Sequence, residues 1–128
     1  MKTPYTVALS VLTGAVLGAT AIHGLHAQPK PIAYVVAEID VSNQEGYVKE
    51  YLPPSSKALL DAGAKYLARG SKTVAIKGDA PKRIVLFSFE NLDRAEAAYN
   101  SPAFVEAVKI GEKYAKFRIS AVEGSPQP

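Results

Sequence analysis

The sequence predicts an α+β domain in which a four-stranded antiparallel sheet is covered by helices on one face. Three observations predict it. Segments rich in β-branched and aromatic residues alternate with segments of helical periodicity, glycine and proline clusters separate them, and the chain has 128 residues, which allows one domain. We place this domain at residues 32–124.

The first strand is expected at residues 32–41, "IAYVVAEIDV", between prolines and the polar run "SNQEG". Strand alternation puts five apolar residues on one face: Ala33, Val35, Ala37, Ile39 and Val41. The opposite face holds Ile32, Tyr34 and Val36 together with the acids Glu38 and Asp40. Because the first half is apolar on both sides, this strand needs cover on both faces.

Residues 43–64 carry a helical stripe that two prolines, Pro53 and Pro54, interrupt. We expect two short helical pieces with a kink at the prolines. Gly63 is expected to end the second piece in a left-handed conformation.

An antiparallel hairpin is expected from Lys65 to Phe89. "KYLARG" and "SKTVAIKG" form its first strand, with a bulge at Gly70, "DAPK" turns the chain, and "RIVLFSFEN" returns.

The second helical region begins at Asn91, a suitable N-cap, and is interrupted at "NSP", where Ser101 can cap a new piece beginning at Pro102. "KFRISAVEG" is the last strand. The complete order is the βαββαβ plan of a ferredoxin-like sandwich. Its uncovered, partly apolar sheet face predicts a homodimer in which two sheets face each other as a dimeric α/β barrel.

The pattern of residues 1–27 is typical of a signal peptide: Lys2 precedes an apolar stretch, and the expected cleavage site follows Ala27. An uncleaved anchor is the rival interpretation, but the stretch is shorter than the roughly 20 residues of a spanning helix. We therefore expect a periplasmic or secreted protein without stable membrane insertion after cleavage. Residues 28–31 would form an extended leader and residues 125–128 a disordered tail.

The composition excludes several kinds of site. Cysteine is absent, and the two histidines, His23 and His26, both lie in the expected signal peptide. We accordingly expect no metal site and no cofactor held by thiolate or imidazole ligands. The net charge of +3 is scattered, which argues against nucleic acid as a partner.

The pattern "AYVVAEIDV", "AKYLARG", "PKRIVLFSFENLDRAEAAYNSPAF" and "KFRISAVEG" resembles the domain of unknown function 1330 family over Ala33 to Gly124. The resemblance implies a ferredoxin-like dimeric α/β barrel, similar in architecture to small monooxygenases of antibiotic biosynthesis. It implies no particular reaction.

Five residues are candidates for chemistry. Arg69 and Arg83 could bind a carboxylate or another anion, or could form surface ion pairs. Ser101 could contact a ligand or serve only as a cap, and Tyr99 could transfer a proton or only pack its ring. Glu38 is either a buried carboxylate suited to proton transfer or a solvated residue, depending on its surroundings.

Three functions remain open. The chain could bind a small, partly apolar or anionic molecule between sheet and helices, with Arg69 as anchor. It could be a cofactor-independent oxygenase or isomerase that uses Glu38 or Tyr99. It could also be a purely structural dimer, and the residues do not decide whether it is an enzyme.

Overall fold

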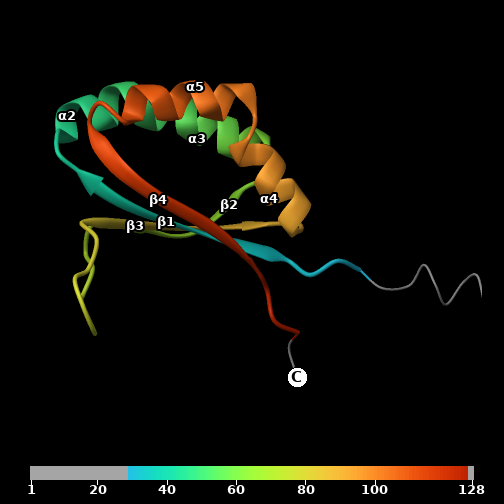
Figure 1. Ribbon diagram of the computed structural model, residues 1–128. Helices are drawn as coiled ribbons and strands as arrows, with labels where there is room; N and C mark the ends of the chain where they lie inside the picture. Colours follow the sequence, from blue (N-terminus) through green and yellow to red (C-terminus); the bar gives the residue numbers. More distant parts are fainter. Residues whose placement is uncertain (1–28, 127–128) are drawn as a thin grey trace, which may run out of the picture.

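The computed structural model describes residues 29–126, and it shows a twisted sheet with a layer of helices on one face (Figure 1). The strands are β1 (Ala33–Val41), β2 (Lys65–Gly70), β3 (Arg83–Phe89) and β4 (Ala115–Glu123). The helical elements are α2 (Gln44–Gly46), the π-helical turn η1 (Tyr47–Tyr51), α3 (Leu52–Asp61), α4 (Leu92–Tyr99) and α5 (Pro102–Gly111).

The strand order is β2-β3-β1-β4, and all neighbouring strands are antiparallel. This confirms the predicted α+β, ferredoxin-like fold with helices on one face. The expected signal peptide lies outside the described residues. Among residues 29–126, no helix is long and apolar enough to cross a membrane.

Strand β1 lies in the interior of the sheet, and its burial alternates as predicted. Ala33 and Val35, on the helix-facing side, are completely buried, whereas Tyr34 and Asp40, on the other side, are exposed. We call the side that carries Tyr34, Val36, Glu38 and Asp40 the open face.

The interruption expected at Pro53 and Pro54 lies just before them and is a π-helical turn between two helical pieces. The helix widens before the prolines, where the amide of Leu52 donates to the carbonyl of Tyr47 across η1, and both prolines lie in the first turn of α3. A π-helical turn shifts the backbone hydrogen bonds from i→i+4 to i→i+5, and it lies just before the two prolines, which have no N–H to donate. Tyr47 and Tyr51, at the two ends of η1, are both buried.

The first strand of the hairpin is shorter than predicted. Strand β2 ends at Gly70, residues 71–82 form a loop, and the irregularity in pairing falls between Tyr66 and Ala68 rather than at Gly70. The β-branched residues of "SKTVAIKG" suggested a strand. Strand β3 begins only at Arg83, and on this side its residues pair with β2, so residues 71–78 have no neighbouring strand to pair with.

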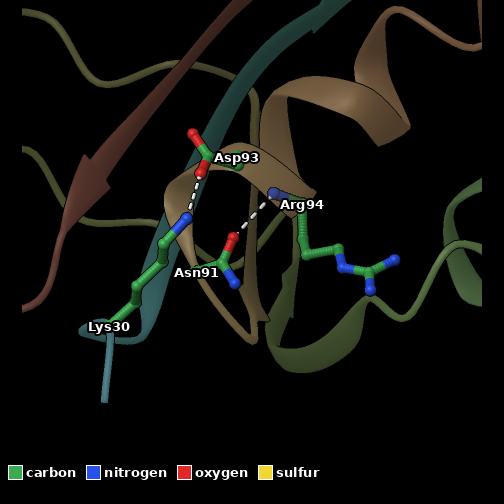
Figure 2. A network of polar contacts seen from close by, with 4 residues as sticks. All are labelled: Lys30, Asn91, Asp93 and Arg94. Atoms are coloured by element: carbon green, nitrogen blue, oxygen red, sulfur yellow. Dashed lines mark hydrogen bonds and ion pairs between the residues drawn. The ribbon is translucent and has the colours of Figure 1, made fainter. Parts of the chain in front are cut away.

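The helix ends follow the predicted capping residues. The side chain of Asn91 accepts from the amide of Arg94 at 2.9 Å, and Lys30, from the segment before β1, pairs with Asp93 at 2.6 Å (Figure 2). The Lys30–Asp93 pair is exposed, so it contributes little stability. Ser101 accepts from the amide of Phe104 at 3.3 Å.

At the end of α3, Gly63 has φ +98°. This confirms its predicted left-handed conformation, which glycine adopts without the steric cost that other residues meet.

The core between sheet and helices is rich in aromatic rings. Tyr51 lies 5.1 Å from Tyr47 and 4.9 Å from Phe117, measured between ring centroids. Gly111 closes this stack, because a Cβ atom at this position would lie 2.5 Å from Cδ2 of Tyr51 and 2.9 Å from Cζ of Phe117. The close approach of α5 to these rings therefore requires glycine.

We predict that Gly111→Ala lowers the free energy of unfolding by about 1–2 kcal/mol, because overpacking outweighs the better helix propensity of alanine. Urea unfolding of the two proteins measures the difference. Gly70→Ala is the matched control, since a Cβ there meets nothing closer than 3.9 Å. Equal stability of Gly111→Ala and the parent would contradict this account of the aromatic stack.

Candidate functional site

A cavity of about 80 Å³ lies between the sheet and the helices. It is lined by residues from β1, β2, β3, β4, η1, α3, α4 and α5. Most of the wall is aromatic or aliphatic, and its polar groups come from tyrosines, Ser55, Ser56, Arg69 and Arg83. This combination of an apolar wall with a few polar groups is typical of small-molecule sites.

Two guanidinium groups border the cavity. Cζ of Arg69 lies 4.5 Å from the centroid of the Tyr66 ring, and Cζ of Arg83 lies 5.9 Å from that of Tyr47. Arg69 is exposed on the edge strand β2, whereas Arg83 is partly buried at the start of β3. Arg69 therefore marks the mouth of the cavity, and Arg83 lies deeper.

Four tyrosines surround the same space: Tyr47, Tyr51, Tyr66 and Tyr99. Burial raises the pKa of Tyr47, although the nearby Arg83 guanidinium partly opposes this effect. Burial also raises the pKa values of Tyr51 and Tyr99 well above the usual value for tyrosine. These three phenols are consequently protonated at neutral pH and can donate hydrogen bonds.

Two polar atoms stand out within the described part of the chain. The Nε of Arg83 and the hydroxyl of Tyr99 are buried and have no hydrogen-bond partner there. By contrast, the hydroxyl of Tyr66 is 3.1 Å from Oγ of Ser56. A buried polar group without a partner costs about 1–3 kcal/mol, so the two unpartnered atoms call for a ligand or ordered water.

The structure brings three of the five predicted site residues together, since Arg69, Arg83 and Tyr99 all line the cavity. Ser101 does not line it, and its hydroxyl donates to the carbonyl of Ala98 at 2.7 Å as well as capping α5. Glu38 lies on the open face, with its carboxylate 3.8 Å from Nε of Arg118 and its side chain 41% exposed. Glu38 and Tyr99 therefore do not share a site.

Five further hydroxyl-bearing lining residues were not among the predicted site residues: Tyr47, Tyr51, Tyr66, Ser55 and Ser56. The spacing of Tyr47 and Tyr51 indicated one helical stripe, which was the available signal. The approach of Tyr47 to Arg83 joins η1 to β3, and helical periodicity does not predict a contact between two elements.

The arrangement suits an anion with an apolar body. Arg83 and Arg69 can neutralise it, the aromatic wall can hold a ring or alkyl group, and Tyr99 can donate to an oxygen. No carboxylate or imidazole is among the residues that line the cavity. Within residues 29–126 there is also no cluster of three His, Cys, Asp or Glu side chains that could hold a metal ion.

Solved structures share this fold at low sequence identity. The protein RPA0582 of unknown function from Rhodopseudomonas palustris has a TM-score of 0.63 and 12% identity, covering 84% of this chain and 94% of its own. SnoaB, a cofactor-independent oxygenase from Streptomyces nogalater, has a TM-score of 0.55 and 7% identity, with coverage of 76% and 96%. HapK from Hahella chejuensis has a TM-score of 0.52 and 9% identity, with coverage of 75% and 95%.

At these identities the likeness shows the fold alone. No curated protein matches the chain significantly. The family described as "Domain of unknown function (DUF1330)" matches residues 32–125, which is most of the chain and includes every strand and helix of the described residues. The chain therefore belongs to the DUF1330 family.

Proposed function

We propose that this protein binds a small, partly apolar anion in the cavity between sheet and helices. The observation that carries the proposal is that Arg83 and Tyr99 both line one aromatic cavity, and that the Nε of Arg83 and the hydroxyl of Tyr99 are buried without a partner among the described residues. A ligand with an anionic oxygen would satisfy Arg83 directly, because a guanidinium only donates hydrogen bonds. Arg69 at the mouth would attract the anion and help to hold it.

We also propose that the protein is exported and acts as a homodimer. Export rests on the signal-peptide pattern of residues 1–27, and dimerisation rests on the apolar side chains of the open face. The cavity lies on the helix side of the sheet, so a partner on the open face would leave it accessible.

A cofactor-independent oxygenase is a second candidate. The guanidinium groups would stabilise the anion of an enolised or phenolic substrate, and SnoaB shares the fold. The binding function has more support, because no lining residue is an evident general base and the protonated Tyr99 is suited to donating a hydrogen bond. Oxygen uptake by the protein with an enolisable, ring-bearing acid would favour the oxygenase.

Benzoate should bind weakly in the cavity, with a dissociation constant on the order of millimolar for so small a ligand. Its neutral isostere benzamide should bind at least about tenfold more weakly, because it lacks the charge that pairs with Arg83. Affinity should be flat from about pH 6 to 9, because arginine stays charged and the raised pKa values keep Tyr47 and Tyr99 protonated. Chemical shifts of the ¹⁵N-labelled protein measure each affinity.

Two variants locate this binding. Arg83→Met should abolish the preference for benzoate, whereas the control Arg118→Met, on the open face, should preserve it. Equal affinities for benzoate and benzamide, or shifts confined to the open face, would contradict the proposed site.

Tyr99→Phe should raise the free energy of unfolding of the empty protein by about 1 kcal/mol, because it removes a buried hydroxyl without a partner. Tyr66→Phe should instead lower it by about 1 kcal/mol, because it breaks the bond with Ser56. Urea unfolding of both variants makes the comparison. If Tyr99→Phe proves as destabilising as Tyr66→Phe, the Tyr99 hydroxyl is already satisfied and is not held free for a ligand.

Expression in a Gram-negative host should give a periplasmic protein that begins at Gln28 and has the mass of a dimer. Subcellular fractionation followed by native mass spectrometry tests both points. Retention of residues 1–27 in the membrane fraction would refute cleavage, and a monomer at micromolar concentration would refute the dimer.

A further inference from the structure

The loop between β2 and β3, residues 71–82, carries the most exposed large apolar side chains of the described chain. We call this loop the arm. Ile76 is 97% exposed and Val74 is 83% exposed, whereas the next most exposed large apolar residue, Val122, is 57% exposed. Two such side chains close together on one loop are unusual for a surface that faces only water.

The arm is attached firmly at its base and extends freely at its tip. Oγ1 of Thr73 donates to the carbonyl of Pro81 at 3.1 Å, and the amide of Lys82 donates to Oδ1 of Asp40 at 3.0 Å. Gly78, with φ +73°, turns the chain within the tip. The base therefore sets the direction in which the arm extends.

That direction is away from the helices. In Figure 1 the arm, in yellow and green, hangs from the sheet on the side opposite the helical layer. The open face is on the same side. Any molecule that covers the open face would also meet the arm.

The chemistry of the open face favours a second copy of this chain as that molecule. Tyr34, Val36, Leu86 and Val122 lie on it as cross-strand neighbours and supply apolar surface. Glu38 and Asp40 stand beside Arg118 and Lys116 on the same face, so it carries acids and bases together. A surface with both charges can complement itself about a two-fold axis, whereas an anionic lipid surface would complement only the bases.

We propose that the arm reaches across the homodimer and packs Val74 and Ile76 against the open face of the second copy. This inference rests on the homodimer proposed above and adds to it a contact made by a segment outside the sheet. Each protomer contributes one arm, so the contact occurs twice in the dimer.

The absence of cysteine allows a direct test in the full chain. Ile76→Cys, labelled with a benzophenone maleimide, is mixed with ¹⁵N-labelled parent protein and photolysed, and the cross-linked peptides are identified by mass. We expect cross-links between protomers that end on β1, β3 or β4. The same label on Lys109→Cys, an exposed residue of α5, should give no such product.

A second measurement compares dimer dissociation constants. Val74→Ser combined with Ile76→Ser should weaken the dimer by at least about tenfold, since each arm loses two buried apolar side chains. Val105→Ser, which removes an exposed apolar residue from α5, is the matched control and should leave the constant unchanged.

The outcomes separate the two proposals. A dimer with an unchanged constant in the double variant and no cross-link to the open face overturns the arm contact while the homodimer stands. A parent protein that is monomeric overturns both. Binding of the parent, but not of the double variant, to vesicles of phosphatidylcholine and phosphatidylglycerol overturns the arm contact in favour of a lipid surface.

Discussion

Exclusion of water from the helix-facing side of β1 is the constraint on which the rest of the structure depends. Ala33, Val35, Ala37 and Ile39 are nearly or wholly buried there, in the interior of the sheet. A one-residue change of register would turn Glu38 and Asp40 into the core, which costs far more than a domain of this size can supply. The pairing of β1 with β3 and β4, and hence the floor of the cavity, is fixed by this alternation.

Much of the fold could be predicted because its signals are local. The faces of β1, the caps Asn91 and Ser101, and the left-handed Gly63 each depend on a few neighbouring residues. The errors occurred where the outcome depends on pairing or packing. The arm has the composition of a strand but no partner strand, and η1 responds to two prolines in a way that periodicity alone does not predict.

The candidate site was less predictable, since it is assembled from eight elements. Sequence reasoning identified Arg69, Arg83 and Tyr99 but could not show that they share a cavity. It also singled out Glu38. Strand alternation placed Glu38 on the same face as Tyr34, but it did not decide whether that face is buried or exposed to solvent. Tyr47 meets Arg83 of β3 and Tyr51 meets Phe117 of β4, and in each pair the two residues are more than 30 positions apart in the chain.

We propose a different kind of partner for each side of the sheet, because the groups that each side leaves without contacts differ. The open face presents exposed apolar and charged side chains that any complementary surface can cover. On the other side, the lining residues Arg83 and Tyr99 each carry a buried polar atom that has no hydrogen-bond partner among the described residues. The total stability of a protein is on the order of 5–15 kcal/mol. An unpaired donor beside an aromatic wall reduces that margin in the empty protein and contributes to affinity when a ligand with a matching acceptor enters. In the proposed binding mode, Arg69 at the cavity mouth and Arg83 deeper within it would give such a ligand a direction of entry, with its anionic oxygen toward Arg83.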